Sequence, residues 1–288
     1  MIKPAIQGFL GLLAHFPLRF QYRFADLVVF VICAVPNRFS RQMQQNIGLC
    51  FPELDQAAQK RLYRQALRHT VYAFFELAAV WYWPAEKILP WITTLDICEE
   101  FQRTTRGKII LVPHLGSWEL LGIWLGQHCG AIILYKRLKN KVLDGYIRQV
   151  RGRTGGSPVP TRKHGLRKLL VGLRANGTLM ILPDQKPGGG KARINSEIFG
   201  IDAPTTTLVR SLCNKVDCDV FIATIYRSAP PGEFGLIIQP LDHDQLAHDE
   251  ATSARYMNNK IEQLVRQFPE QYQWSYRRFS NRAYGPAK

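Results

Sequence analysis

The sequence predicts an α/β fold, in which a largely parallel or mixed central sheet is flanked by helices and preceded by N-terminal membrane-associated helices. From residue 107 onward, short apolar runs alternate with helix-like stretches, the pattern of a parallel sheet covered by helices. Before residue 37, the chain is apolar and is interrupted by single charged residues. With 46% hydrophobic and 21% charged residues among 288, the chain can bury a core and is not disordered.

Residues 1–36 are interpreted as a membrane-anchoring helical segment and residues 37–288 as a single α/β domain. Arg19, Arg23 and Asp26 interrupt the apolar run of the first segment, so no uninterrupted span of about 20 apolar residues remains. No cleavage site typical of a signal peptide is evident. Two short apolar helices flanked by arginines are typical of a segment that lies in a bilayer interface. The alternative is a helical hairpin buried in the core.

After Pro36 we expect a basic connector and then a long helix. Asp55 is a candidate N-cap for this helix, which runs to about Trp83 and stops at Pro84. The apolar runs that are expected to form buried strands are residues 108–112, 131–135, 178–182, 219–226 and 234–239. The helix-like stretches between and after them are residues 117–128, 139–152, 164–175, 205–215 and 252–268.

Most of the positive charge is concentrated in one part of the chain. The net charge is +16, and the stretch from Lys136 to Arg193 holds 15 lysines and arginines but only two acidic residues. Because these basic residues interrupt predicted strands and glycine-rich loops, the stretch indicates an anion-binding site rather than a solvated face. Nucleic acid is not expected as the partner, because the aromatic residues cluster in apolar helices and are not interleaved with the basic ones.

The six cysteines indicate reduced thiols in a cytosol-facing protein. None of them forms a Cys-x-x-Cys pair, and most lie in apolar runs, where a free cysteine behaves as a small hydrophobic residue. Cys213 and Cys218 are close in sequence within a helix-like stretch, without paired histidine ligands nearby. His243 and His248 lie in an acidic loop and are interpreted as surface residues. We therefore expect no metal, no disulfide and no cofactor.

Residues 114–119, which read His-Leu-Gly-Ser-Trp-Glu, carry the candidate chemistry. His114 directly follows a predicted buried strand, where ligands of parallel sheets collect. Ser117 is a candidate N-cap, and Glu119 falls in the first turn of the next helix, within reach of His114. A neutral imidazole serves as a general base near pH 7, and a carboxylate on its other nitrogen fixes the tautomer. The spacing alone is a weak signal, since such residues are often structural.

The same stretch resembles the His-(four residues)-Asp/Glu motif of glycerolipid acyltransferases, and more closely the lauroyl/myristoyl transferases of lipid A biosynthesis. Further segments resemble that family in the same order along the chain: Asn-Ile-Gly-Leu-Cys-Phe-Pro-Glu-Leu at 46–54, Leu-Pro-Asp-Gln at 182–185, Phe-Gly at 199–200 with Ala-Pro-Thr-Thr at 203–206, and Pro-Glu-Gln-Tyr-Gln-Trp at 269–274 followed by Arg-Arg-Phe at 277–279. Together these segments cover about residues 5 to 285. The resemblance implies a glycerol-phosphate acyltransferase-like fold.

The resemblance also implies a reaction: a fatty acyl group passes from a thioester, usually on acyl carrier protein, to a hydroxyl of a phosphorylated glycolipid, the lipid A precursor. On this basis His114 removes the hydroxyl proton, Glu119 orients His114, and Arg151 holds anionic substrate or the developing oxyanion. Candidate substrate-binding residues are Lys136, Arg148, Arg153, Asp184 and Trp118. For Asp184, capping of a turn is an equally good interpretation. The expected location is the bacterial inner membrane, at an anionic membrane surface, with the active site facing the cytoplasm.

Some residues depart from the family pattern and leave the acceptor open. Tyr135 is followed by Lys-Arg where members commonly have Arg-Pro, and Ser275-Tyr276 stands where members often have a histidine in second place. One alternative is an acyltransferase of the same fold that acts on a lysophospholipid, glycolipid or aminolipid. Another is a basic, membrane-peripheral binding protein without enzymatic activity.

Overall fold

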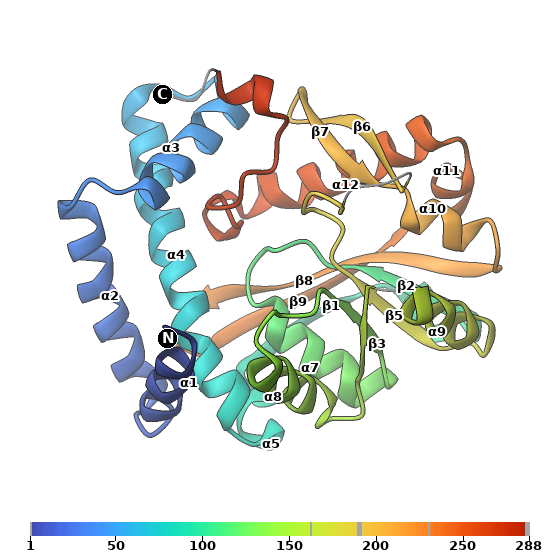
Figure 1. The fold of residues 1–288 in the computed structure, drawn as a ribbon, viewed down its shortest axis with the longest axis horizontal. Coiled ribbons are helices and arrows are strands. Elements are labelled where there is room, and N and C mark those ends of the chain that lie inside the picture. The colour runs from blue at the N-terminus through green and yellow to red at the C-terminus, as the bar shows by residue number, and fades with distance from the viewer. Residues whose placement is uncertain (1, 162, 189–191, 230, 286–288) are drawn as a thin grey trace.

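Seven strands form the central sheet, in the spatial order β1-β9-β8-β2-β5-β3-β4 (Figure 1). The computed structural model describes residues 2–161, 163–188, 192–229 and 231–285, without the side chains of residues 2–7, 163 and 164. Neighbouring strands are parallel except for the antiparallel pair β8 and β9. The strands of this sheet are β1 (Ile92–Ile97), β2 (Gly107–Leu111), β3 (Ile132–Tyr135), β4 (Ser157–Pro160), β5 (Thr178–Ile181), β8 (Cys218–Ala229) and β9 (Glu233–Leu241). The predicted α/β class with a mostly parallel sheet is confirmed.

The helices lie around this sheet and at its end (Figure 1). They are α1 (Ile2–Leu13), α2 (Leu18–Ala34), α3 (Arg38–Cys50), α4 (Gln56–Tyr82), α5 (Ala85–Ile88), α6 (Glu99–Arg103), α7 (Trp118–Cys129), α8 (Lys141–Gly152), α9 (Lys163–Arg174), α10 (Leu208–Cys213), α11 (His243–Ala247) and α12 (Glu250–Gln267). A hairpin of β6 (Arg193–Ile198) and β7 (Ile201–Thr206) stands apart from the sheet. Every strand and helix predicted after residue 107 is present, with shifted ends.

The strands that the sequence did not predict lie at the edges of the sheet or outside it. β1 and β4 are the two edge strands, and β6 and β7 form the separate hairpin. β4 reads Ser-Pro-Val-Pro, and proline lacks the N–H that a central strand needs. β1 exposes most of its residues, so it has no apolar run. The helix expected over residues 205–215 begins late because residues 205 and 206 complete β7.

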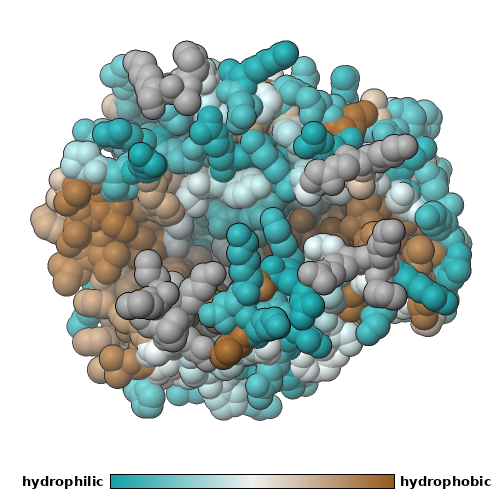
Figure 2. All heavy atoms as spheres, in the orientation of Figure 1, coloured by the Kyte–Doolittle hydropathy of each residue, from teal (hydrophilic) through white to brown (hydrophobic). Residues whose placement is uncertain are grey.

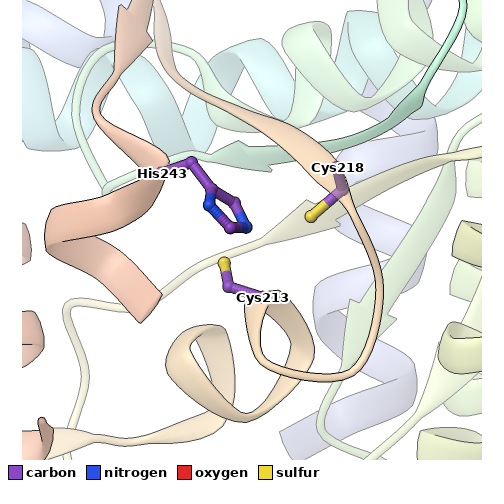
Figure 3. A group of neighbouring side chains, drawn as sticks. All are labelled: Cys213, Cys218 and His243. Atoms are coloured by element: carbon purple, nitrogen blue, oxygen red, sulfur yellow. The ribbon is translucent and has the colours of Figure 1, made fainter. Parts of the chain in front are cut away.

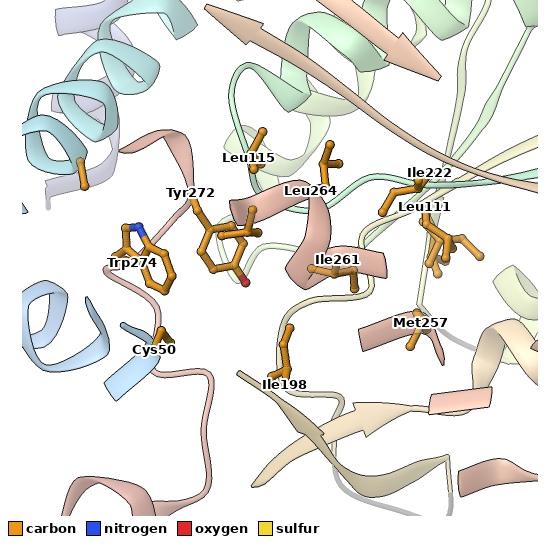
Figure 4. Packing of buried hydrophobic residues seen from close by; sticks show 14 of the residues in the cluster. Cys50, Leu111, Leu115, Ile198, Ile222, Met257, Ile261, Leu264, Tyr272 and Trp274 are labelled. Carbon is orange, nitrogen blue, oxygen red and sulfur yellow. The ribbon is translucent and has the colours of Figure 1, made fainter. Parts of the chain in front are cut away.

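Two apolar layers cover the two faces of the sheet. Along β2, Ile109 and Leu111 join a cluster that includes α9, α10 and α12, while Ile110 faces a second cluster formed with α7 and α8. Alternation of this kind places successive side chains on opposite faces of a strand. Figure 4 shows part of the first cluster, where Leu111 lies with Ile261 of α12. Because both faces are covered, the carboxyl ends of β2 and β5 remain for a site.

The N-terminal helices α1 and α2 pack against α4 (Figure 1). Leu10, Tyr22 and Ala25 are buried in the same cluster as α4. The buried Gln21 side chain donates hydrogen bonds to the carbonyls of Leu13 and Phe16 and so fixes the turn between the two helices. Among the described helices, none combines the length and the apolar character that crossing a bilayer requires.

The long helix α4 begins where the sequence predicted. The Asp55 side chain caps it by accepting a hydrogen bond of 2.6 Å from the Ala58 N–H, and Trp83 is its C-cap. The expected basic connector after Pro36 is instead the helix α3, capped by Asn37, whose side chain accepts from the Ser40 N–H. That interpretation was wrong because the basic residues occupy the exposed face of an amphipathic helix, whose other face buries Met43.

A buried ion pair joins α4 to the sheet. Arg227 on β8 donates two hydrogen bonds, of 2.6 and 2.7 Å, to the carboxylate of Glu76. Tyr22 of α2 donates to the same carboxylate. Arg227 also exchanges backbone hydrogen bonds of 2.8 and 3.0 Å with the Gln271 side chain. These contacts lock the N-terminal helices, the sheet and the C-terminal segment into one arrangement.

The loop after β2 lies against β8, and Gly116 makes this possible. Gly116 has a φ of +65°, and a Cβ placed there would lie 2.0 Å from the Ile225 carbonyl oxygen. The Ser117 N–H donates to that oxygen at 2.7 Å, and the Thr224 hydroxyl donates to the Leu115 carbonyl. Only glycine permits both the conformation and the close approach.

We expect Gly116→Ala to lower the free energy of unfolding by at least about 2 kcal/mol and to displace the loop, because the added carbon collides with backbone. Urea unfolding of both proteins measures the loss. Gly145→Ala is the control: this helical glycine has an ordinary φ and open space around its Cβ position, so the change should be neutral or stabilising. Equal stability of both variants would contradict the assigned constraint.

Candidate active site

His114 lies just beyond the carboxyl end of β2 and lines a cavity of about 630 Å³. Asp184, which follows β5, lies beside it because β2 and β5 are adjacent and parallel. The His114 ring Nδ1 is 2.8 Å from one Asp184 carboxylate oxygen, and the His114 backbone N–H donates to the other oxygen at 2.8 Å. Asp184 therefore holds both the backbone and the ring of His114.

The surroundings of Asp184 keep it ionised. Its carboxylate is buried, which raises its pKa, but the charge of His114, the two hydrogen bonds from His114 and the charge of Arg278 outweigh burial, so the pKa lies below its ordinary value. Arg278 is itself fixed by donating to the Thr205 hydroxyl at 3.0 Å. The buried carboxylate is thus a permanent acceptor for the ring N–H of His114.

The second ring nitrogen of His114 points into the polar part of the site. The Gln185 side-chain amide lies 3.1 Å from His114 Nε2 and also donates to the Gln273 side chain at 3.2 Å. Donation from Nδ1 to Asp184 and acceptance at Nε2 from Gln185 is the hydrogen-bond pattern of a neutral imidazole whose lone pair is on Nε2. The Gln273 N–H donates to the His114 carbonyl at 3.0 Å and so supports the same geometry.

Glu119 pairs with Arg151 and, within the described residues, makes no hydrogen bond to His114. Arg151 donates from Nε to one Glu119 oxygen at 3.1 Å and from Nη2 to the other. Both side chains are largely buried yet line the same cavity as His114. The expectation that Glu119 orients His114 does not fit this geometry, because Asp184 occupies Nδ1 and Gln185 occupies Nε2.

The amino end of α7 faces the cavity beside His114. Ser117 is the N-cap residue, as the sequence predicted, but its side chain makes no capping hydrogen bond. The first N–H groups of a helix lack partners within the helix and carry partial positive charge. Trp118 and Glu119, the first two residues of α7, line the cavity, so this helix end favours an anion there.

The basic residues that the sequence predicted as substrate-binding lie in three different parts of the structure. Arg151 and the exposed Lys136 line the cavity. Arg148 is exposed and lines a separate hollow of about 590 Å³ together with Lys168. Arg153 instead donates to the carbonyls of Trp81 and Val80 at the end of α4, at 3.0 and 2.7 Å. Its guanidinium therefore serves helix packing, and the structure does not bring it to the cavity.

A second cavity adjoins the first at Trp118. It has a volume of about 500 Å³, and its described lining contains no lysine, arginine, aspartate or glutamate. It lies between α2, α4 and the C-terminal segment, and Trp118 lines both cavities. The Trp118 ring centroid is 5.2 Å from that of His114. His69 lines the apolar cavity, where burial and the charges of Arg227 and Arg68 lower the pKa of His69 to about 3, so it is uncharged there.

Sequence reasoning did not assign roles to Gln185, Gln273 and Tyr272. The first lies in the Pro-Asp-Gln turn and the other two in the Gln-Tyr-Gln-Trp segment, so both motifs contained the signal. Burial and the charge of Asp184 hold the pKa of Tyr272 well above its ordinary value, so its hydroxyl remains protonated beside this carboxylate. These residues were missed because only the fold brings Gln185 and Gln273 to His114 and the Tyr272 phenol to Asp184.

His114, held by a buried carboxylate, lines a cavity that also carries basic residues, and Trp118 lines both this cavity and an apolar one. The family model for bacterial lipid A biosynthesis acyltransferases matches residues 3–281, and the chain belongs to this family. It is therefore an acyltransferase, and the resemblance seen in its motifs is confirmed.

Individual enzymes of lipid A biosynthesis are similar to this chain over most of its length. The lipid A biosynthesis palmitoleoyltransferase of Escherichia coli (strain K12) is 26% identical over 245 residues, which are 84% of this chain and 79% of that protein. The lauroyltransferase of the same organism is 22% identical over 281 residues, covering 96% of this chain and 91% of that protein. Its myristoyltransferase is 29% identical over 237 residues, covering 80% and 71%.

We expect Glu119→Gln to lower the free energy of unfolding by about 3 kcal/mol near pH 7, because the buried Arg151 cation loses its partner. Burial raises the pKa of Glu119, but the charge and hydrogen bonds of Arg151 outweigh it and hold that pKa below its ordinary value. The stabilisation is therefore complete above the unfolded-state pKa of about 4.3 and is lost as pH falls through the lower folded-state pKa.

Urea unfolding of wild type and Glu119→Gln from pH 3 to pH 7 measures this difference, which should narrow below about pH 4. Glu99→Gln is the control, since its ion pair with Arg103 is exposed and should contribute less than about 1 kcal/mol. A difference between wild type and Glu119→Gln that stays constant over this range would contradict the role of the ion pair.

Proposed function

We propose that the protein transfers a fatty acyl group from acyl carrier protein to a hydroxyl of a phosphorylated lipid A precursor, with His114 as the general base. The observation that carries the proposal is the position of His114, which lines a cavity with basic residues next to Trp118, a residue that also lines an apolar cavity. Family membership supports lipid A biosynthesis as the setting. The names of the three relatives indicate acyl donors of different kinds.

The proposed reaction begins with the acceptor hydroxyl in the place that the Gln185 amide now takes at His114 Nε2. His114 removes the hydroxyl proton while the oxygen attacks the thioester carbonyl, and Asp184 stabilises the imidazolium that forms. The tetrahedral intermediate collapses, the carbon–sulfur bond breaks, and the proton on His114 passes to the leaving sulfur. The products are the new ester and the carrier thiol, and His114 returns to its neutral form.

The developing oxyanion needs positive charge that is already in place. The amino end of α7 and Arg151 both lie on the cavity, and the ion pair with Glu119 fixes the guanidinium in position. Lys136 at the same cavity suits a phosphate of the acceptor. Glu119 is therefore proposed as a positioning residue for Arg151, and Asp184 as the residue that orients His114.

The apolar cavity is the proposed site of the acyl chain. Its described lining contains no lysine, arginine, aspartate or glutamate, and it includes Trp118, whose ring lies 5.2 Å from that of His114, where the thioester would have to lie. The hollow lined by Arg148 and Lys168 lies outside this cavity and offers positive charge to an acidic carrier protein. An alternative acceptor, such as a lysophospholipid or another glycolipid, would fit the same arrangement.

We also propose that the protein works on the cytoplasmic face of the inner membrane, with α1 and α2 lying in the bilayer interface. Figure 2 shows hydrophobic side chains gathered on the side of the molecule where α2 lies. Phe20, Leu27 and Phe30 are 47%, 56% and 71% exposed, a large apolar surface for a helix in water. Arg19 and Arg23 are exposed beside them and suit anionic lipid headgroups.

We expect His114→Ala and Asp184→Asn to reduce kcat for acyl transfer by about 10²–10⁴-fold, because the first removes the base and the second removes the acceptor that fixes its tautomer. Transfer in detergent from labelled acyl carrier proteins of several chain lengths to a phosphorylated lipid A precursor measures the loss. His248→Ala, an exposed histidine in the loop before α12, is the control.

Near-wild-type transfer activity of His114→Ala would refute the assignment of His114 as the general base. If thioester cleavage depends on His114 but no acyl group reaches this acceptor, the proposed role of His114 stands and the acceptor is another lipid.

We expect the variant carrying Phe20→Gln, Leu27→Gln and Phe30→Gln to bind anionic vesicles at least about 10-fold more weakly than wild type, because burial of these side chains in the interface drives binding. Flotation with vesicles of phosphatidylglycerol and phosphatidylethanolamine measures binding. Val142→Gln with Val171→Gln is the matched control, since both valines are highly exposed on α8 and α9. Equal losses in both variants would contradict docking through α2.

A further inference from the structure

Two cysteines and a histidine meet on the described part of the chain, outside the active site (Figure 3). Cys213 ends α10, Cys218 begins β8 and His243 begins α11. Their sulfur atoms and an imidazole nitrogen all lie within 4.8 Å of one another. The expectation that both cysteines share one helix-like stretch was wrong, because the helix ends at Cys213 and the chain turns into β8. The expectation of no metal was based on a lack of nearby histidine, and the fold brings His243 to the two thiols.

The imidazole is turned so that one nitrogen is left for a ligand. His243 Nε2 is buried and has no hydrogen-bond partner among the described residues. His243 Nδ1 lies 3.4 Å from the Asp244 carboxylate on the exposed side. A buried ring nitrogen without a partner is costly, whereas a metal-binding histidine typically places its other nitrogen next to a carboxylate or carbonyl.

We propose that Cys213, Cys218 and His243 bind one zinc ion, with water as the fourth ligand. Zinc takes thiolate sulfur at about 2.3 Å and imidazole nitrogen at about 2.0–2.1 Å, so tetrahedral ligand atoms lie about 3.5–3.8 Å apart. From separations of up to 4.8 Å, the three ligand atoms need to approach one another by at most about 1.3 Å, which small side-chain rotations at the partly exposed His243 and at the helix end allow. Both thiols are buried and unoxidised, as zinc ligation requires.

The local charge also favours a cation, in contrast to the rest of this basic chain. Asp217 and Asp219 flank Cys218, and Asp242 and Asp244 flank His243. Arg106 forms ion pairs with the first two of these carboxylates, at the outer side of the turn. The acidic residues of the loop that carries His243 would therefore help to attract a cation to the cluster.

The position of the cluster assigns the zinc ion a structural role. Cys218 pairs with Gly107 at the first residue of β2, whereas His114 follows the last residue of that strand. The cluster therefore lies at the amino end of β2 and β8, whereas the active site lies beyond the carboxyl end of β2. A bound zinc ion would join α10, β8 and α11 and would stabilise the fold without taking part in acyl transfer.

The test uses the full-length protein in detergent, kept reduced and freed of metal, with cobalt and zinc ions as probes. We expect one equivalent of Co²⁺ to produce the thiolate-to-cobalt charge-transfer band and tetrahedral d–d bands, and Zn²⁺ to abolish both. Zinc at about 100 times its Kd should raise Tm by about 5–10 °C. Transfer activity per folded molecule should not change.

Cys218→Ser and His243→Ala should each lose the cobalt bands and the rise in Tm. Cys50→Ser and His248→Ala are matched controls, a buried cysteine and a loop histidine outside the cluster, and should retain both. Absence of cobalt bands in the wild-type protein would overturn the proposal, whatever the variants do. A second outcome would also overturn it: mass spectrometry finds a Cys213–Cys218 disulfide after exposure to air, and the reduced protein binds no metal. The two cysteines would then be a site of thiol oxidation.

Discussion

The ion pair between Glu76 and Arg227 is the contact on which the rest of the structure depends. Two charges buried together need further hydrogen bonds to offset the loss of water, and here Tyr22 donates to the Glu76 carboxylate while the Gly116 carbonyl accepts from Arg227. The Gln271 side chain holds the backbone of Arg227 in place. The pair therefore fixes four parts of the chain at once: α2, α4, β8 and the C-terminal segment. Each of those parts also lines the apolar cavity or supports His114, so the geometry of the site follows from this packing.

Hydrophobic periodicity predicted the α/β body because buried strands and amphipathic helices have different spacings of apolar residues. It located His114 at the end of β2 for the same reason, and the capping preference of aspartate located Asp55 at the start of α4. Periodicity could not predict β1 and β4, whose sequences are polar or contain proline at the sheet edges. Nor could it predict the partner of His114, because parallel neighbours far apart in sequence bring Asp184 to it, whereas Glu119 is only a neighbour in sequence.

The two carboxylates near His114 are kept apart by their counterions and partners. Asp184 has His114 as its main hydrogen-bond partner, while Arg151 takes both oxygens of Glu119. The ion pair with Glu119 positions the Arg151 cation where negative charge would develop in the proposed reaction.

Trp118 lies between two cavities of different polarity at this site. On one side lie Lys136, Arg151 and the amino end of α7, which favour phosphate and an oxyanion. On the other side lies a cavity whose described lining has no lysine, arginine, aspartate or glutamate, and where burial keeps His69 uncharged. An acyl thioester has its reactive carbonyl at the junction of a polar carrier and an apolar chain. The thioester carbonyl reaches His114 only when the acyl chain enters the apolar cavity beside Trp118. The proposed orientation of the donor therefore follows from the polarity of the two cavities.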